Sequence, residues 1–274
     1  MPELPEAETI ARDLDRRVRG GIVAGVHVTR PDILAPGNSA TKLARSLRGH
    51  RIERVGRRGK NVVVDFDGGL KLVVNLGMTG RLIASDAPRS AEMRHVAARI
   101  ELDDGRSVLY DDARRFGRLD LRDASTWTVR DAELGIEPLS KDFTGERLFA
   151  LTRGSIVPLR NWLLDQRRVA GVGNIYANEA LFRARVRPTR RARFLTRVEA
   201  IRLRDGLHEV LSKAIQARGT TIDDYRDGEG ESGGFQLRLQ VYGRTGEPCF
   251  RCGTPIKRIV LTNRSAFYCP RCQR

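Results

Sequence analysis

The chain has 274 residues, 40% of them hydrophobic, and its 50 Lys and Arg against 34 Asp and Glu give a formal charge of +16. No apolar run approaches the ~18–20 residues that span a bilayer, and the first residues lack the layout of a signal peptide, so we expect a cytoplasmic protein. The positive charge attracts polyanions and makes nucleic acid the first partner to consider, although arginine enrichment can also reflect genome composition.

The first expected element is an amphipathic helix over residues 6–18, because Ile10, Leu14 and Val18 recur four residues apart. Short β-branched runs separated by Gly and Asp turns then fill residues 22–130, which predicts an all-β segment folded as a β-sandwich. The clearest predicted strands are Asn61–Phe66, Lys71–Asn75, Ala97–Leu102 and Ser107–Tyr110.

Helical periods return between residues 139 and 218. The predicted helices are Gly145–Leu151, Val157–Gln166, Ile175–Val186 and Val198–Ala217. A glycine-rich stretch between Asp223 and Phe235 predicts a flexible loop. We therefore predict an α+β chain of three domains: a β-sandwich over 1–130, a helical domain over 139–227 and a cysteine module over 240–274.

All four cysteines lie near the end of the chain, as two Cys-x-x-Cys pairs 16 residues apart. This spacing is typical of a four-thiolate zinc site, in which each pair sits on a tight turn and the two pairs close a tetrahedron. The alternative, two disulfides, needs an oxidising compartment for which the sequence holds no signal. The predicted ligands of one zinc ion are Cys249, Cys252, Cys269 and Cys272.

The opening Met-Pro-Glu places a small residue after the initiator methionine, so removal of Met1 would expose the secondary amine of Pro2. An α-amino group titrates near ~8, well below lysine, and its unprotonated form can attack a sugar carbon to form an iminium. Glu3 lies next to this amine and could move protons during the reaction. Taken alone, however, an initial Pro-Glu is usually only a mobile terminus.

Longer stretches of the chain resemble the formamidopyrimidine-DNA glycosylase/endonuclease VIII family, and its formamidopyrimidine-DNA glycosylase branch in particular. The opening residues 1–9 match that branch, and the resemblance continues to the end of the chain. The further matching stretches are residues 57–60, 75–80, 112–117, 170–179 and the cysteine module with Arg264.

The resemblance implies roles for eight residues besides the cysteines. It makes Pro2 the nucleophile, Glu3 a proton carrier and Lys60 a catalytic-site residue that contacts phosphate. It also implies a wedge that fills the space left by an extruded nucleotide and kinks the duplex, a helix-two-turns-helix motif and a phosphate-binding hairpin. The DNA-binding residues implied in this way are Met78, Arg115, Phe116, Asn174 and Arg264.

The residues alone would permit simpler interpretations. Lys60 could be a solvated lysine, Met78 a core residue, and Asn174 a helix cap that serves only folding. Four thiolates leave no open coordination position, so the zinc is expected to be structural.

The activity that the resemblance implies is excision of oxidised purines, namely 8-oxoguanine and formamidopyrimidines, from duplex DNA, followed by strand cleavage through β- and δ-elimination. It further implies a monomer of the bacterial cytosol and nucleoid that needs no redox cofactor. Damaged double-stranded DNA is the expected partner, and no membrane partner is expected.

Two alternatives stay open. An endonuclease VIII-like enzyme would prefer oxidised pyrimidines, but Leu4 and the long loop 220–236 favour the purine branch. A non-catalytic zinc-finger DNA-binding protein would not need Pro2, Glu3 and Lys60. The chain also departs from the family pattern, which often has His where Asn75 stands and a His-x-His pair where Met93-Arg94-His95 stands. We expect these changes to alter affinity and to leave the chemistry intact.

Overall fold

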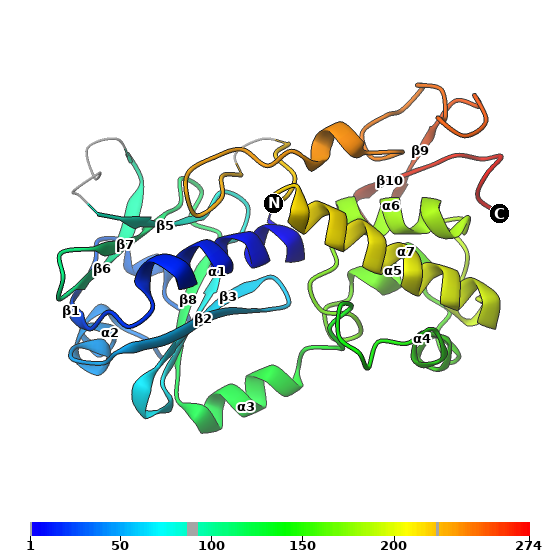
Figure 1. Cartoon of the computed structure of the whole chain (residues 1–274). Coiled ribbons are helices and arrows are strands. Elements are labelled where there is room, and N and C mark those ends of the chain that lie inside the picture. The colour runs from blue at the N-terminus through cyan, green and yellow to red at the C-terminus, as the bar shows by residue number, and fades with distance from the viewer. Residues whose placement is uncertain (1, 87–92, 223–224) are drawn as a thin grey trace. The chain divides into compact units, whose positions relative to one another are not determined.

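The computed structural model of the chain describes residues 2–86, 93–222 and 225–274 (Figure 1). The chain forms two compact units: unit 1 comprises Met1–Ala132 and Ala217–Gly234, and unit 2 comprises Glu133–Gln216 and Phe235–Arg274. Met1, whose removal we predict, and part of the predicted loop 223–235 lie outside the described residues. The three-domain division at 1–130, 139–227 and 240–274 remains a proposal.

Unit 1 begins with helix α1 (Leu4–Val18), which confirms the predicted amphipathic helix and starts two residues earlier than expected. The earlier start has a local cause, since Glu3 is the N-cap and forms a capping box with Glu6. The apolar face of α1, with Ile10 and Leu14, is buried in the core of unit 1.

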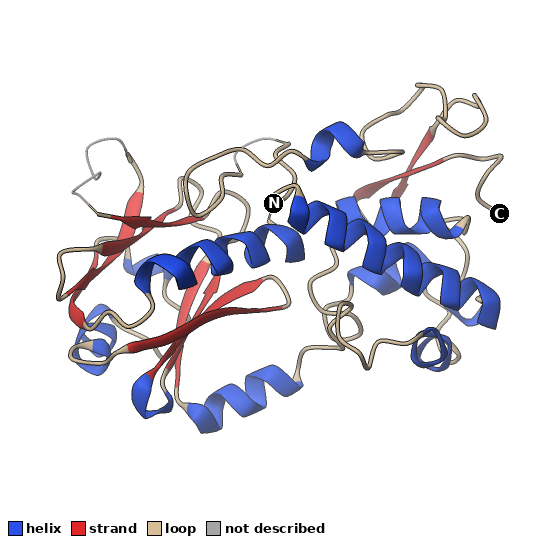
Figure 2. Cartoon of the chain, in the orientation of Figure 1, coloured by secondary structure: helices blue, strands red, loops and turns tan. Residues whose placement is uncertain are grey.

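Two four-stranded antiparallel sheets follow, and together they confirm the predicted β-sandwich (Figure 2). Side chains from both sheets and from α1 share one hydrophobic core, as the alternating strand pattern requires. One sheet has the order β1 (Val23–Val28), β6 (Val96–Leu102), β7 (Ser107–Asp111) and β5 (Arg81–Ser85). The other has the order β2 (Ile52–Arg58), β3 (Asn61–Phe66), β4 (Lys71–Asn75) and β8 (Arg118–Arg122).

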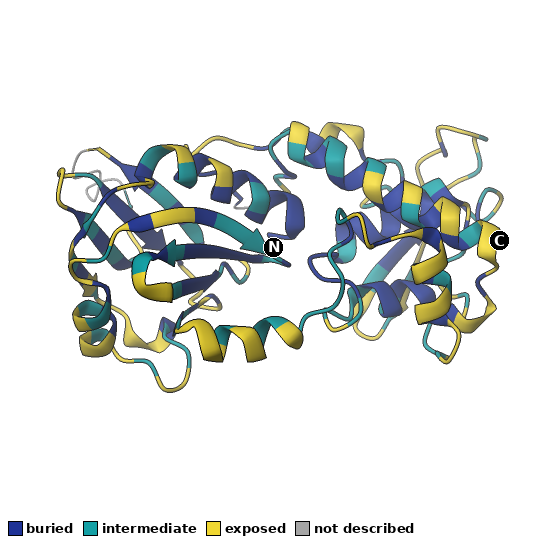
Figure 3. Cartoon of the chain, turned by 60° about the horizontal axis from the view of Figure 1, so that its bottom comes forward, coloured by how far each residue is buried: buried dark blue, intermediate teal, exposed yellow. Residues whose placement is uncertain are grey.

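The prediction that residues 22–130 are all-β is wrong at two helices, α2 (Ala40–Leu47) and α3 (Ala124–Ala132). Helix α2 buries only Leu43 and Leu47 and is capped by the Ser39 side chain, so its apolar signal is too short to show a helical period. Helix α3 has no buried residue, and its surface is exposed or half-buried (Figure 3). Without a buried face, α3 carries no amphipathic pattern in its sequence.

Unit 2 is built on four helices, which confirms the four predicted helical segments: α4 (Gly145–Thr152), α5 (Leu159–Leu164), α6 (Asn174–Ala184) and α7 (Arg197–Gln216). Helix α7 packs on both α4 and α6. A β-carbon at Gly145 would lie 2.6 Å from the Ile201 side chain, so the α4–α7 contact requires glycine there.

The cysteine module of unit 2 contains the antiparallel hairpin β9 (Lys257–Leu261) and β10 (Arg264–Tyr268). Its buried residues pack around Phe182 of α6 in one small core with Cys249 and Cys269. Among the described residues, no helix is both long and apolar enough to cross a membrane.

Candidate functional site

The first described residues are part of unit 1: Pro2 is buried and Glu3 is only 2% exposed. The backbone N–H of Glu3 donates to Oε2 of Glu6 at 2.8 Å, and Oε1 of Glu6 accepts from the Thr220 backbone N–H at 2.7 Å. Glu6 therefore joins the residue after Pro2 to the segment 217–234. Sequence reasoning missed this role, although the Glu-x-x-Glu spacing of a capping box could have revealed it.

Lys60 lies half-buried in the turn between β2 and β3. Gly59 before it has φ +60°, a conformation that favours glycine. The Arg57 guanidinium holds this turn, since Nε donates to Oε2 of Glu8 on α1 at 2.9 Å and Nη1 donates to the Gly59 carbonyl at 2.9 Å. The turn that carries Lys60 is thus bound to the helix that follows Pro2.

The ion pair between Arg57 and Glu8 is only 9% and 21% exposed at its two side chains. Burial alone would raise the pKa of the Glu8 carboxyl, but the hydrogen bond and charge of Arg57 lower that pKa below its usual value. Glu8 therefore stays ionised and keeps its contact with Arg57 at neutral pH. Neither residue was predicted as part of the site, although Arg57 stands in the matching stretch 57–60.

Two turns of unit 1 bring Met78 and Phe116 to one surface. Met78 lies in the β4–β5 connection and is 39% exposed, while Phe116 lies between β7 and β8 and is 55% exposed. Gly77 has φ +59°, and a β-carbon on it would lie 2.5 Å from the Gly117 nitrogen, so the two turns touch through their backbones. Exposed large apolar side chains on packed turns are suited to insertion between bases.

Asp112 fastens these turns together. Its buried carboxylate accepts hydrogen bonds from Oγ1 of Thr79 at 2.6 Å, from the Tyr110 hydroxyl at 3.0 Å and from the Gly117 backbone N–H at 2.9 Å. Burial and the nearby Asp112 charge raise the pKa of Tyr110, so its hydroxyl remains a donor. Sequence reasoning included Asp112 in a matching stretch and assigned it no role.

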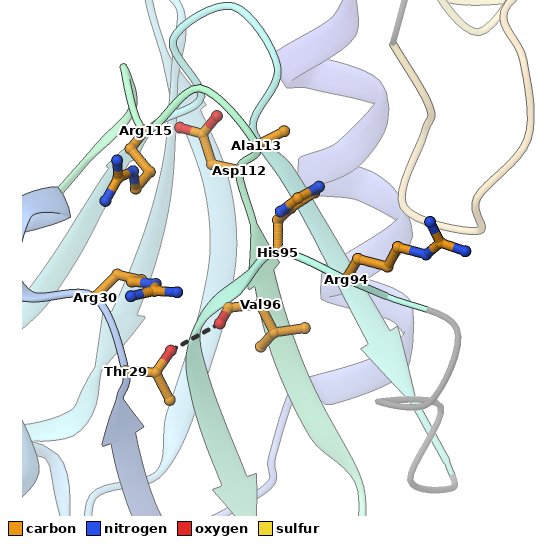
Figure 4. A pocket seen from close by; sticks show the side chains of 8 residues that line it. All are labelled: Thr29, Arg30, Arg94, His95, Val96, Asp112, Ala113 and Arg115. Carbon is orange, nitrogen blue, oxygen red and sulfur yellow. Dashed lines mark hydrogen bonds between the residues drawn. The ribbon is translucent and has the colours of Figure 1, made fainter.

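Arg115 stands beside Phe116 in the left-handed region, with φ +55°. Its Nη1 lies 3.3 Å from Oδ2 of Asp32, and both side chains are about half exposed. Arg115 also lines a surface hollow of about 710 Å³ (Figure 4). The figure shows Arg30 near Arg115 on one side of the hollow and His95 on the other. This basic lining suits an anionic ligand.

One departure from the family pattern, Asn75, has a local structural role. Asn75 donates through Nδ2 to Oδ1 of Asn61 at 2.9 Å, and its Oδ1 accepts from the Gly77 backbone N–H at 3.0 Å. Asn75 thus supports the turn that carries Met78. Met93 and Arg94 border a second hollow of about 410 Å³ next to β1 and β6.

In unit 2, Asn174 is the first residue of α6, and the N-cap is Gly173. The interpretation of Asn174 as the helix cap is therefore wrong, because its Nδ2 donates to the Ser265 carbonyl on β10 at 3.0 Å. The Gln166 side chain braces the preceding turn: its Oε1 accepts from the Gly171 N–H, and its Nε2 donates to the Val172 carbonyl. Gln166 was not predicted, and its sequence position gives no signal of this role.

Arg264 begins β10 and is exposed, directly after a turn in which Thr262 and Asn263 have φ of 45° and 60°. Buried Arg160 of α5 stabilises the residues after this turn, because its Nη2 donates to the carbonyls of Arg264 at 2.7 Å and Ser265 at 2.9 Å. Asn174 and Arg160 thus both bind the Ser265 carbonyl. Unit 2 thereby brings two predicted DNA-binding residues, Asn174 and Arg264, to one hairpin.

The four cysteines fit a single zinc ion, since their sulfurs all lie within 4.8 Å of one another. The Cys249–Cys272 and Cys252–Cys269 sulfur pairs are 4.0 and 3.5 Å apart. A tetrahedron with Zn–S bonds of ~2.3 Å places its sulfurs about 3.8 Å apart. Each knuckle is braced by its own backbone, as in the Cys252 N–H donating to the Cys249 carbonyl. The donor set and its spacing confirm the predicted zinc site.

Three family models match the chain in succession. They are the formamidopyrimidine-DNA glycosylase N-terminal domain over residues 1–119, the formamidopyrimidine-DNA glycosylase H2TH domain over 134–226, and a zinc finger found in FPG and IleRS over 246–274. The first two matches contain the predicted catalytic residues, the wedge and Asn174. The third contains the four cysteines and Arg264.

Relatives and solved structures agree with these matches. A formamidopyrimidine-DNA glycosylase of Thioalkalivibrio sulfidiphilus is 44% identical, and one of Chloroflexus aurantiacus is 41% identical; both alignments cover the whole chain and 100% and 98% of the relative. A mutant of the Lactococcus lactis FPG in complex with a Fapy-dG containing DNA is similar with a TM-score of 0.90 and 33% identity, over the whole of both chains. The MutM (FPG) protein of Thermus thermophilus has a TM-score of 0.87 and 42% identity, covering 99% and 98% of the two chains. The chain therefore belongs to the formamidopyrimidine-DNA glycosylase family, whose activity is that of a DNA glycosylase and AP lyase.

Proposed function

We propose that this chain excises oxidised purines, 8-oxoguanine and formamidopyrimidines, from duplex DNA and then cleaves the strand, with Pro2 as nucleophile. The observation that carries the proposal is the fixed N-terminus: Pro2 and Glu3 are buried, and Glu6 holds the backbone of Glu3. Similar structures of the Lactococcus lactis protein contain Fapy-dG DNA or abasic-site DNA, which supports the substrate class.

The chemistry begins with the unprotonated Pro2 nitrogen, which attacks C1′ of the damaged nucleotide as the bond from C1′ to the base breaks. The base leaves with the bonding electron pair and takes up a proton. The C1′–O4′ bond then breaks as the Pro2 nitrogen loses its proton and the ring oxygen gains one, which leaves an iminium between Pro2 and C1′ and makes the C2′ proton acidic. Loss of that proton expels the 3′ phosphate, and a second elimination expels the 5′ phosphate.

Glu3 and Lys60 complete the proposed catalytic set. Glu3 stands next to Pro2, where its carboxyl group would donate a proton to the sugar oxygen and later accept one. Lys60, held by the Gly59 turn, would place its positive charge beside a departing phosphate.

The other predicted residues would bend and hold the DNA. Met78 and Phe116 would enter the duplex from their packed turns, and Arg115 would meet the cytosine left opposite the extruded base. Asn174 and Arg264 would contact phosphates near the lesion, since basic and amide groups on a hairpin or helix start bind the backbone more often than they read bases. Zinc, held by the four cysteines, would support this hairpin. Because four thiolates leave no open coordination position, the ion would have a structural role only.

The proposal includes a monomer that works in the bacterial cytosol and nucleoid. Two alternatives make different predictions. An endonuclease VIII-like enzyme would act mainly on oxidised pyrimidines, and a non-catalytic zinc-finger protein would bind DNA without cutting it.

The test compares excision from four duplexes of one sequence, which contain 8-oxoguanine, a formamidopyrimidine, thymine glycol or an abasic site. The proposal predicts kcat/KM values that are at least about tenfold higher for the two purine lesions than for thymine glycol, and cleavage of the abasic duplex to ends that both carry phosphate. A preference for thymine glycol would assign the chain to the pyrimidine branch, whereas binding without cleavage of any duplex would favour the non-catalytic alternative.

A further inference from the structure

Arg218 occupies an unusual place in segment 217–234 of unit 1. It follows the end of α7 and has φ +59°, in the left-handed region that residues with a β-carbon rarely adopt. Its side chain is 37% exposed. A conformation of this kind persists only when surrounding contacts hold it.

Two buried carboxylates supply those contacts. Nη2 of Arg218 lies 2.6 Å from Oδ2 of Asp13 on α1, and Nε lies 2.6 Å from Oδ2 of Asp227 in the same segment as Arg218. The Asp13 side chain is 1% exposed and the Asp227 side chain is fully buried. Buried carboxylates require a positive charge, and Arg218 joins the two, with help from the exposed Arg16 at Oδ1 of Asp13.

Backbone groups add to this network. The Gly228 N–H donates to Oδ2 of Asp13 at 3.2 Å, and Oδ1 of Asp227 accepts from the N–H groups of Glu229 and Glu231. A β-carbon at Gly228 would lie 2.6 Å from the Asp13 β-carbon, so the segment lies directly on α1. Its described part is therefore bound to the helix through charge and through close packing.

A second attachment lies nearer the N-terminus. The Thr220 N–H, two residues after Arg218, donates to Glu6, and Glu6 in turn accepts from Glu3. Glu6 and Asp13 are seven residues apart, about 10 Å along α1. The described part of segment 217–234 is thus attached to α1 at two points, and the second of them, at Glu6, reaches the residue next to Pro2.

We propose that Arg218 is a positioning residue for base excision: by binding Asp13 and Asp227 it fixes the described residues of segment 217–234 on α1, and this fixing sets the space available to the damaged base at Pro2. The inference rests on the proposed function. The proposed role of Arg218 concerns the space for the damaged base and not the sugar, so base removal and strand cleavage should respond differently to its loss. Removal of an intact lesion depends on Arg218, whereas cleavage at a site that has already lost its base does not.

The experiment compares the Arg218→Met, Arg218→Lys and Asp13→Asn variants with wild type on matched 8-oxoguanine and abasic duplexes, in single turnover below the melting temperature of each variant. Displacement of a positioning group by about 1 Å can cost on the order of a hundredfold. We therefore expect Arg218→Met to lower the excision rate by about tenfold to a hundredfold with less than a twofold change in abasic cleavage. Arg218→Lys, which keeps the charge, should recover part of the loss.

Arg226→Met is the matched control, because Arg226 lies in the same segment and donates to Ser232 of that segment, and among the described residues no hydrogen bond or ion pair joins its side chain to α1. It should leave both rates unchanged. The inference would be overturned if Arg218→Met and Asp13→Asn lowered the rates on both duplexes equally, or lowered neither rate. If Arg218→Met fails to fold, the same comparison of the excision rate with the abasic cleavage rate is made with Arg218→Lys and Asp13→Asn. Failure of the proposed function would instead show as no 8-oxoguanine excision by wild type.

Discussion

The two units hold their functional residues in different ways. In unit 1, tight turns and buried carboxylates position them: Asp112 accepts from Tyr110 on β7 and from one donor in each of two turns, and Glu6 joins Glu3 to Thr220. In unit 2, helix side chains donate to carbonyls of a hairpin, as Arg160 and Asn174 do at Ser265, and four cysteines close a metal site. The turns of unit 1 are therefore held by buried carboxylates, and the Arg264 hairpin of unit 2 is held by donors to its carbonyls and by a metal site.

This difference predicts how each unit responds to mutation. Loss of a carboxylate in unit 1 leaves buried donors without an acceptor, which affects chemistry and folding together. Loss of a donor in unit 2 loosens the hairpin that we propose to contact DNA, so affinity should fall while the chemical step is retained. The following variants test that contrast.

The largest effect is expected at Glu3. Glu3→Gln removes the proposed proton carrier and should lower the rate of 8-oxoguanine excision by about 10²–10⁴-fold, the usual contribution of general acid–base catalysis. Single-turnover rates and DNA affinity measured on the same preparation check this. The control is Glu53→Gln, an exposed carboxylate on β2 of the same unit, which should behave as wild type. A Glu3→Gln enzyme within threefold of wild type would remove Glu3 from the mechanism.

Gly117→Ala tests the packed turns of unit 1. The new β-carbon would lie 1.7 Å from the Tyr110 hydroxyl oxygen, so the turn that carries Phe116 must shift. We expect a loss of about 3 kcal/mol in the free energy of unfolding, from overpacking, measured by urea titration. Gly154→Ala is the matched control, because nothing lies within 4 Å of its β-carbon position. Equal stability of the two variants would contradict the described contact.

Loss of zinc tests unit 2. Cys249→Ser removes one of four thiolates, and we expect the purified variant to hold less than one zinc ion per chain, with metal affinity reduced by at least about 10–100-fold. DNA affinity should fall with it, because Arg264 stands on the hairpin of the same module. Zinc content by atomic absorption and binding to an abasic-site analogue provide the readouts. Wild-type DNA affinity in the zinc-free variant would show that the hairpin does not need the metal to bind DNA.

Arg160→Met should have a smaller effect of the same kind. The variant fills the buried site but gives no hydrogen bonds to the Arg264 and Ser265 carbonyls, and bonds from a charged donor are worth about 1.5–3 kcal/mol. We expect DNA affinity to fall by about tenfold with the excision rate at saturating enzyme unchanged. Arg167→Met, at an exposed position of unit 2, is the control. A lower rate at saturation would show that Arg160 acts on the chemical step.

The smallest effect is expected at Glu8. Its pKa is lowered in the folded chain, so the stabilisation it gives is present above the pKa of the unfolded state and is lost as pH falls through the folded-state pKa. Glu8→Gln should therefore reduce stability by no more than about 1 kcal/mol at pH 7, and the difference from wild type should vanish in acid. Urea titrations at several pH values measure this. If the difference in unfolding free energy between wild type and Glu8→Gln grew toward low pH, the pKa of Glu8 would be raised and not lowered by folding.

The sequence predicts those features whose signal is local. Cysteine spacing indicates the zinc site, and four-residue spacing of Ile10 and Leu14 indicates α1. The β-branched runs at Asn61–Phe66 and Lys71–Asn75 have the bounds of β3 and β4. Each of these signals comes from neighbours in the chain.

Features that depend on distant residues were not predicted. The bond from Arg160 to the Arg264 carbonyl joins residues 104 positions apart, and that from Arg218 to Asp13 joins residues 205 apart. Helix α3 was missed because it buries no residue. The roles of Lys60 and Phe116 came from resemblance, since a lysine or a phenylalanine alone has no chemical signature in sequence, whereas the position of Pro2 after Met1 already indicated a reactive amine.

The most direct test of the proposed mechanism is to trap the covalent intermediate. Wild-type protein is incubated with a duplex containing 8-oxoguanine opposite cytosine in the presence of borohydride, which reduces an iminium to a stable amine, and the adduct is mapped by mass spectrometry. We predict a single adduct on the N-terminal peptide, at the nitrogen of Pro2. An adduct at Lys60 or at another lysine, or excision with no adduct at all, would contradict the mechanism.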